Sequence, residues 1–223
     1  MKIKVMGMSS NMDVNGVKVI TRLLDKFGYD HEIMHRVTQW GCQQVETYEW
    51  CLENRHKYTH FIYTDTWDIL FIAPFSEFLA KLPDTEFLGS VEKAFFPPNE
   101  ATQARYKPCE TEWKYINAGS WFCSIERFIK WQEEVPSKGV NDQTWLHERY
   151  LDSMERGENV MLDTNCEIFQ SIAFDGGNDF EYDMKRQRLI NLKTGSEPII
   201  LHGNGRTHMG KVYELINEPY IAH

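Results

Sequence analysis

The sequence lacks the features that mark membrane-spanning and disulfide-stabilised proteins. No run approaches the roughly 20 apolar residues that cross a bilayer. Residues 1–8 alternate apolar side chains with lysine instead of forming the apolar core of a secretory signal. The five cysteines are odd in number and include no CxxC pair, which argues against a disulfide framework and against a structural zinc site. We therefore expect a cytoplasmic protein without a membrane span.

Basic residues are also in the minority. The 24 Lys and Arg residues are outnumbered by 33 Asp and Glu residues, which gives a formal net charge of -9. General nucleic-acid binding is disfavoured by this charge, although a local basic groove is not excluded. No repeat or low-complexity tract is present, and 223 residues of ordinary composition suit one domain over residues 1–223.

The most informative stretch is residues 60–71, which combines an apolar, β-branched and aromatic strand pattern with two carboxylates, Asp65 and Asp68. Acids released at the end of a central strand would lie at the mouth of the ligand cleft of an α/β sheet. Such oxygen ligands suit Mn²⁺ or Mg²⁺. The alternative is that Asp65 only caps a helix that starts near Ile69.

The chain before this stretch alternates strands with helices. A strand at residues 3–8 is followed by a helical pattern at 17–27, a strand at 31–37 and a helix between residues 40 and 54. This alternation predicts a doubly wound α/β sheet flanked by helices.

The rest of the chain also alternates predicted helices and strands. We expect helices at 75–82, at 125–134 and from 141 onward, with strands at 86–91, within 115–123, at 160–162 and at 198–201. Residues 99–111 are polar and aperiodic and predict a surface loop, and residues 175–191 predict a hairpin or a mobile insertion.

Three further positions are candidates for a site. The small residues of 117–119 would let a ligand approach the backbone closely, or would form only a bulge. Asp142 is either functional or an N-cap of the helix that follows. His202 lies between a strand and two glycines, which would expose an imidazole beside backbone amides, and with the two aspartates it completes a three-ligand metal set.

Several of these stretches occur in an order that resembles the glycosyltransferase domain of the procollagen lysyl hydroxylase family. They are residues 64–71, 89–93, 115–119, 142–143, 162–163 with 168–170, and 201–205. The resemblance implies the GT-A glycosyltransferase fold, a single Rossmann-like domain with a mainly parallel mixed sheet, and a manganese ion that binds a UDP-sugar.

The resemblance also implies roles for individual residues. Asp65, Asp68 and His202 would be the metal ligands, with Mn²⁺ preferred and Mg²⁺ as an alternative. Trp67 would stack on the uracil ring, and Trp40 is a candidate for the other face of the ring.

The donor sugar and diphosphate would contact a second set of residues. Asn117 and Asp142 are the catalytic candidates, Asp142 by hydrogen-bonding sugar hydroxyls or assisting transfer. The residues expected to line the donor are Asn117, Ala118, Gly119, Gly203, Asn204 and Gly205. The family commonly places a phosphate-binding lysine six residues after the histidine; here that position is His208, so Arg206 and Lys211 are the nearby cations, with Lys211 as the candidate.

We therefore expect a metal-dependent transferase that moves a hexose, glucose or galactose, from UDP to a hydroxyl acceptor. The acceptor classes that remain open are a hydroxylated protein side chain, a glycan, a lipid and a hydroxylated nucleobase. The alternatives are a nucleotide-sugar hydrolase and a non-catalytic nucleotide-sugar-binding module.

Overall fold

A mixed sheet of six strands forms the centre of the computed structural model, which describes residues 1–35, 43–173, 179–205 and 207–219. The strands lie in the order β2-β1-β3-β6-β5-β7. Their bounds are β1 Ile3–Ser9, β2 His31–His35, β3 His60–Thr64, β5 Phe87–Glu92, β6 Tyr115–Ser124 and β7 Val160–Leu162. β1 runs parallel to β2 and β3, and β5 runs parallel to β7, whereas β6 is antiparallel to both of its neighbours.

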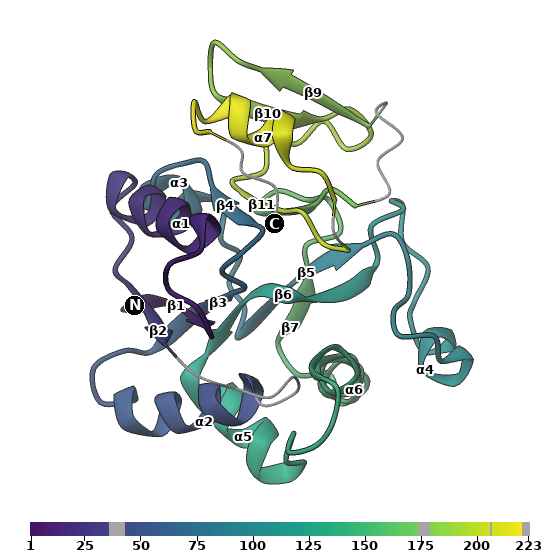
Figure 1. Cartoon of the computed structure of the whole chain (residues 1–223). Helices are drawn as coiled ribbons and strands as arrows, with labels where there is room; N and C mark the ends of the chain where they lie inside the picture. The colour runs from purple at the N-terminus through teal and green to yellow at the C-terminus, as the bar shows by residue number, and fades with distance from the viewer. Residues whose placement is uncertain (36–42, 174–178, 206, 220–223) are drawn as a thin grey trace.

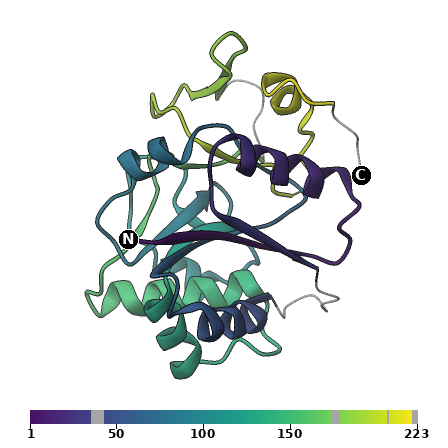
Figure 2. The same cartoon turned by 90° about the vertical axis from the view of Figure 1, so that its left-hand side faces the viewer.

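Helices cover both faces of this sheet (Figures 1 and 2). One face carries α1 (Asn15–Lys26) and α3 (Phe75–Lys81), and the other carries α2 (Gln43–Asn54), α5 (Ile125–Glu134) and α6 (Asp142–Glu155). The α/β architecture expected from the sequence is therefore confirmed, with β6 as an antiparallel strand in the middle of the sheet.

The two-sided burial of the sheet explains why its strands read as continuous apolar runs. Along β3, Phe61 and Tyr63 pack into the core beneath α2 and α5, while Ile62 packs into the core on the opposite face. This alternation follows from the two-residue period of a strand. Charge at the end of such a strand therefore has no packing role.

A smaller three-stranded sheet lies beside the first and has the order β4-β11-β8. Its strands are β4 (Ile69–Phe71), β11 (Ile200–His202) and β8 (Phe169–Ser171). Above it in Figure 1 lie the hairpin of β9 (Phe180–Asp183) and β10 (Arg188–Asn191) and the helix α7 (Gly210–Leu215). The hairpin confirms one of the two alternatives predicted for residues 175–191, of which residues 175–178 lie outside the described part.

Two of the alternatives left open by the sequence are excluded, and one local expectation is wrong. Residues 69–71 form strand β4, so no helix starts at Ile69 for Asp65 to cap. The N-cap of α6 is Asn141, whose side chain accepts a hydrogen bond from the Thr144 amide at 3.0 Å, and Asp142 is the first residue inside the helix. Residues 99–111 are not irregular throughout, because they contain the short helix α4 (Glu100–Ala104).

The other predicted elements are observed to within a few residues. Residues 36–42 fall outside the described part of the chain, so the end of the predicted strand 31–37 and the start of the helix between residues 40 and 54 are not described. Within the described residues no helix is both long and apolar enough to cross a membrane. The four described cysteines are free thiols.

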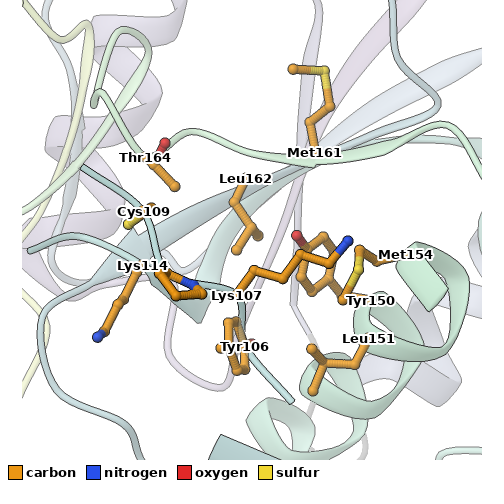
Figure 3. Close-up of a pocket in the computed structure, with 11 residues that line it drawn as sticks. Tyr106, Lys107, Cys109, Lys114, Tyr150, Leu151, Met154, Met161, Leu162 and Thr164 are labelled. Carbon is orange, nitrogen blue, oxygen red and sulfur yellow. The ribbon is translucent and has the colours of Figure 1, made fainter. Parts of the chain in front are cut away.

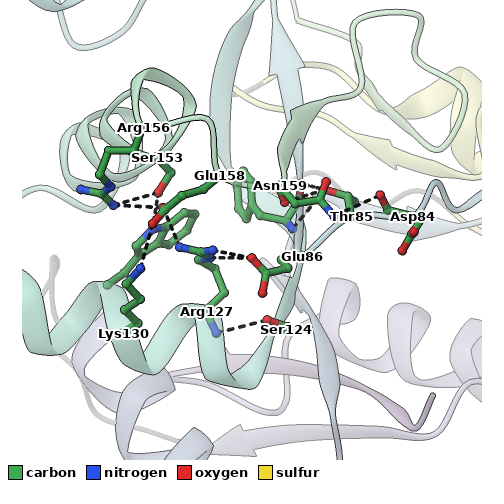
Figure 4. Close-up of polar contacts among 12 residues, drawn as sticks. Asp84, Thr85, Glu86, Ser124, Arg127, Lys130, Ser153, Arg156, Glu158 and Asn159 are labelled. Atoms are coloured by element: carbon green, nitrogen blue, oxygen red, sulfur yellow. Dashed lines mark hydrogen bonds and ion pairs between the residues drawn. The ribbon is translucent and has the colours of Figure 1, made fainter.

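A charged cluster joins α5, the start of β5 and the turn between α6 and β7 (Figure 4). The mostly buried Arg127 guanidinium contacts Glu86 and donates to Glu158 at 2.6 Å. Lys130 and Arg156 also donate to Glu158, at 2.8 and 3.0 Å. The cluster ties three segments distant in sequence to one edge of the sheet.

Candidate metal and nucleotide-sugar site

The acidic turn begins where β3 ends. The Asp65 amide donates to the Gly119 carbonyl at 2.7 Å, which extends the pairing of β3 with β6 by one residue. The buried Thr66 hydroxyl donates to the Met8 carbonyl of β1 at 3.0 Å. The turn is therefore held by the strands on both sides of β3, at the edge where ligands of α/β sheets bind.

The register of the small sheet brings His202 to this turn. In the antiparallel pair of β4 and β11, His202 lies opposite Ile69, the residue that follows Asp68. The Gly203 amide then donates to the Asp68 carbonyl at 2.8 Å. As a result, His202 Nε2 lies 3.4 Å from Asp68 Oδ1.

Asp65, Asp68 and His202 form the three-residue cluster predicted as a metal site. One ligand atom from each residue lies within 4.8 Å of the other two. Two residues come from the turn after β3 and the third from a strand more than 130 positions later, so only the fold brings them together.

The residue at position 119 must be glycine, because the side chains of the cluster approach the backbone there too closely for a Cβ atom. A Cβ atom at Gly119 would lie 2.3 Å from His202 Cε1 and 2.9 Å from Asp65 Oδ2, far inside van der Waals contact. The small residue predicted as a close-approach position therefore accommodates the predicted metal ligands. It lies within the continuous strand β6 and not at a corner.

The electrostatics of the cluster favour a bound cation. Burial, together with the adjacent Asp68 charge, raises the pKa of Asp65 to about 7. Burial lowers the pKa of His202, but the charges of Asp68 and Asp65 outweigh it and raise that pKa above its ordinary value. Two carboxylates held this close repel each other, and a positive charge between them removes the repulsion.

The donor set fits a divalent cation such as Mn²⁺ or Mg²⁺, because two carboxylate oxygens and one imidazole are suitable first ligands. His202 Nε2 faces Asp68, whereas His202 Nδ1 is buried and has no hydrogen-bond partner among the described residues. The imidazole is thus held by the Asp68 carboxylate at Nε2, by packing against Gly119 and by its strand.

Trp67 lies beside the cluster with 44% of its surface exposed. Its indole Nε1 lies 3.3 Å from Ser9 Oγ, which fixes one edge of the ring to the end of β1. The backbone of Trp67 packs against Gly16 so closely that a Cβ there would lie 2.4 Å from the Trp67 carbonyl oxygen. Trp40, predicted to hold the other face of a uracil ring, lies outside the described residues.

The sequence pattern indicates no role for Glu92, yet this residue connects the segments predicted to line the donor. This buried carboxylate accepts hydrogen bonds from Gln143 Nε2 at 2.7 Å, Asn204 Nδ2 at 2.8 Å and Asn117 Nδ2 at 3.2 Å. Burial raises the pKa of Glu92 despite these bonds. The signal was present in the sequence, since Glu92 ends an apolar strand just as Asp65 does.

The Glu92 bonds orient two predicted donor-lining segments. The Asn117 side chain donates to Glu92 through Nδ2, and its Oδ1 accepts a hydrogen bond from the Gly119 backbone N–H at 2.9 Å. Gln143 Oε1 accepts from the Ala118 amide at 3.3 Å. The segment 117–119 and the start of α6 are therefore held together, and the Asn117 side chain is a structural part of that arrangement.

The Asp142 charge acts on the cluster, where it contributes to raising the pKa of Asp65. Burial raises the pKa of Asp142 itself, and one of its oxygens accepts from the Gln143 amide at 2.7 Å. The predicted catalytic carboxylate thus shares an environment with the predicted metal ligands.

The loop after β11 carries the predicted diphosphate-binding residues. Asn204 bridges Glu92 and the Ala173 amide, Gly205 has a left-handed φ of +67°, and a Cβ at Gly203 would lie 2.4 Å from Met209 Sδ. Lys211 is exposed on α7 with its ammonium 5.6 Å from the centre of the Tyr182 ring. Arg206 lies outside the described residues.

Curated relatives match most of this chain. It is 25% identical over 191 residues to procollagen-lysine,2-oxoglutarate 5-dioxygenase 1 of Pongo abelii, a match that covers 82% of this chain and 26% of the relative. It is 25% identical over 187 residues to multifunctional procollagen lysine hydroxylase and glycosyltransferase LH3 of Rattus norvegicus, covering 77% of this chain and 24% of the relative. The matched region spans about a quarter of these proteins.

The fold matches that of a solved glycosyltransferase. This structure, of an enzyme involved in the glycosylation of the major capsid of PBCV-1, aligns with a TM-score of 0.56 at 9% identity, over 97% of this chain and all of the other. It supports the glycosyltransferase fold. The family model described as the PLOD GT domain matches residues 1–222, so the chain belongs to this family of glycosyltransferase domains.

Proposed function

We propose that the protein transfers a hexose, glucose or galactose, from a UDP-sugar to a hydroxyl acceptor with the help of a divalent metal ion. The observation that carries the proposal is the convergence of Asp65, Asp68 and His202 within 4.8 Å beside the exposed Trp67 ring. An acid pair, an imidazole and an exposed aromatic face together suit a metal-bound nucleoside diphosphate.

In this proposal different residues bind different parts of the UDP-sugar. Asp65, Asp68 and His202 hold the cation, and the Trp67 ring stacks on the base. A cation held there would stabilise negative charge that builds on the departing UDP oxygen. We expect the backbone of residues 203–205 to approach the diphosphate, because the Gly203 amide donates to the Asp68 carbonyl beside the cluster.

The sugar would lie against the segment of residues 117–119 and the start of α6. Asp142 is the carboxylate proposed to bind sugar hydroxyls or to accept the proton of the incoming hydroxyl. Its burial favours a carboxyl group that can hold a proton at the reaction centre. The acceptor that supplies the hydroxyl could be a protein side chain, a glycan, a lipid or a modified nucleobase.

The first experiment is a thermal-shift and calorimetric screen of UDP, UDP-glucose and UDP-galactose, each with Mn²⁺ and with a chelator. We expect stabilisation that requires the metal and is larger for one of the two sugars. The variant Asp68→Asn should bind UDP with Mn²⁺ at least about tenfold more weakly, because it removes one anionic ligand. Asp84→Asn, at an exposed acid outside the cluster, is the matched control and should bind normally.

Measurements of product formation distinguish a transferase from a hydrolase and from a binding module. A transferase should release little free sugar without an acceptor and more product when a suitable hydroxyl compound is added. Rapid sugar release that no acceptor accelerates would instead identify a nucleotide-sugar hydrolase. Tight binding of a UDP-sugar without turnover in any mixture would identify a binding module.

A further inference from the structure

The outer strand of the six-stranded sheet has an open edge. β7 pairs with β5 on one side only, with Met161 opposite Leu88 and Leu162 opposite Gly89. The Asp163 amide donates to the Gly89 carbonyl at 3.0 Å. In a parallel ladder of this register, the Met161 backbone groups face β5, so the N–H and C=O of Leu162 and the C=O of Val160 face away from the sheet.

These outward groups are unpaired within the described residues. The open stretch ends at Thr164, whose carbonyl accepts from the Thr111 hydroxyl at 2.6 Å. Three main-chain groups in a row, two acceptors and one donor, are thus available to an added strand. Exposed edges of this kind recruit extended peptides in many proteins.

Two depressions flank the edge, one on each face of the sheet. The first, of about 230 Å³, lies between β7, the α6 side chains Tyr150 and Met154, and the segment 106–109. The second, of about 240 Å³, lies on the opposite face and is lined by Leu88 and Ile168. Met161 and Leu162 line both, and Figure 3 shows their side chains pointing to opposite sides of the chain.

This arrangement matches the period of an extended peptide. Successive side chains of a strand point to opposite faces, so a strand added along β7 would direct alternate side chains into the two depressions. Met161 is 43% exposed, and its side chain is available to contact the row of side chains on its own face of the sheet. A strand of three residues offers few main-chain bonds, and side-chain contacts on both faces would add to them.

The charges of the two depressions differ and indicate the peptide's chemistry. Lys107 and Lys114 line the first, which has no carboxylate in its lining, although the whole chain is acidic. Among the described residues no carboxylate pairs with either ammonium group; Figure 3 shows the Lys107 side chain lying across the depression, and the Lys114 ammonium lies 5.0 Å from the centre of the Tyr115 ring. In the second, Lys81 donates to the Glu167 carbonyl and the Asp163 carboxylate accepts from three backbone amides, so these two charges are already satisfied. The exposed Glu167 carboxylate is the third charge in its lining.

We propose that β7 is a docking site for an extended polypeptide segment that adds a strand to the sheet, with acidic side chains facing Lys107 and Lys114 and apolar ones on the opposite face. None of the residues lining the two depressions belongs to the Asp65, Asp68 and His202 cluster. The proposal is therefore independent of the donor chemistry.

The probe is a synthetic octapeptide of alternating Glu and Val with blocked ends, and its charge-reversed counterpart alternates Lys and Val. Each is titrated into the ¹⁵N-labelled protein. We expect saturable binding of the Glu-Val peptide, with the Leu162 amide among the most shifted signals and its hydrogen exchange slowed. The Lys-Val peptide should bind more weakly, and a Glu-Val peptide N-methylated at every residue should not bind, because it has no main-chain donor on either edge.

Two charge-reversing variants locate the contact. Lys107→Glu should weaken Glu-Val binding about two- to fivefold, the size expected of one exposed charge pair. Lys138→Glu, at an exposed position between α5 and α6, makes the same change in net charge and should leave the affinity unchanged.

Several results would overturn the proposal. These are the absence of saturable binding, equal binding of both peptides, shifts that map away from β7, and an equal effect of the two lysine variants. Shifts of the Leu162 amide that depend only on protein concentration would also count against it, because a second copy of the chain would then cover the edge.

Discussion

A single missing side chain makes room for the proposed metal ligands. Gly119 lies within a fully buried strand, where other residues would strengthen the sheet, yet a Cβ there would overlap both His202 and Asp65. Close packing of this kind leaves no room for even one methyl group.

Gly119→Ala should therefore disable the cluster while the protein still folds. We expect a loss of stability of about 1–3 kcal/mol from overpacking and loss of Mn²⁺-dependent UDP binding, measured by thermal denaturation and calorimetry. Gly157→Ala is the control. This change strains the backbone, which has a φ of +71° at Gly157, but no atom of the protein lies within 4 Å of the added Cβ. It should lose stability and keep binding; equal binding by both variants would contradict the assignment.

Glu92 is the second residue whose identity the site requires. Its two oxygens accept from the amides of Asn117, Gln143 and Asn204, so each amide has a direction set by the carboxylate. Glu92→Gln would point an NH₂ group at one of these donors. The cost should be about 1–3 kcal/mol, the price of an unsatisfied buried group.

The same variant should bind the UDP-sugar more weakly, because the segments 117–119 and 203–205 lose their common partner. Thermal denaturation and calorimetry measure both effects. Glu110→Gln, at an exposed acid, is the matched control and should change neither quantity. A Glu92→Gln protein with unchanged melting temperature would show that the amides do not depend on this carboxylate.

At the scale of elements, charge pairs hold the β7 edge in place. Burial alone would raise the pKa of Glu158, but hydrogen bonds from Arg156, Lys130 and Arg127 lower it well below its ordinary value (Figure 4). A carboxyl group with a lowered pKa in the folded state stabilises the fold above its unfolded pKa of about 4.3. That stabilisation is lost as the pH falls below this value.

We therefore expect the melting temperature to fall between about pH 5 and pH 3, with part of the fall due to Glu158. Glu158→Gln should lower the melting temperature at pH 7 and flatten the fall in acid, which scanning calorimetry over this pH range would measure. Glu133→Gln, at an exposed position on α5, should leave the pH profile unchanged. Parallel profiles for Glu158→Gln and the unaltered protein would contradict this account of the cluster.

The elements also show how far sequence patterns reach. Apolar runs and helix stops located most strands and helices, because burial on both faces of the sheet leaves a strong pattern. Strand β4 was included in the strand pattern of residues 60–71 but not separated from β3, because three apolar residues after a turn are equally compatible with a helix start. Its identity depends on pairing with β11, some 130 residues away.

In the whole molecule, too, the site depends on contacts between residues far apart in the sequence. Asp65, Asp68 and His202 were identifiable as charged or polar residues placed where apolar strands end. The carboxylate of Glu92 followed the same rule but had no recognised partner, since its three amides come from separate segments of the fold. The sequence shows which residues carry charged or polar groups at the ends of strands. Which of these groups contact one another depends on the fold.

If Asp65, Asp68 and His202 hold a divalent cation that binds the UDP diphosphate, electron paramagnetic resonance of Mn²⁺ should detect the bound ion. The signal of free Mn²⁺ should fall until one ion is bound per chain, at lower concentrations when UDP is present. Asp68→Asn should weaken this uptake at least about tenfold. A signal unchanged by the protein, or the same uptake by Asp68→Asn and the unaltered chain, would contradict the claim.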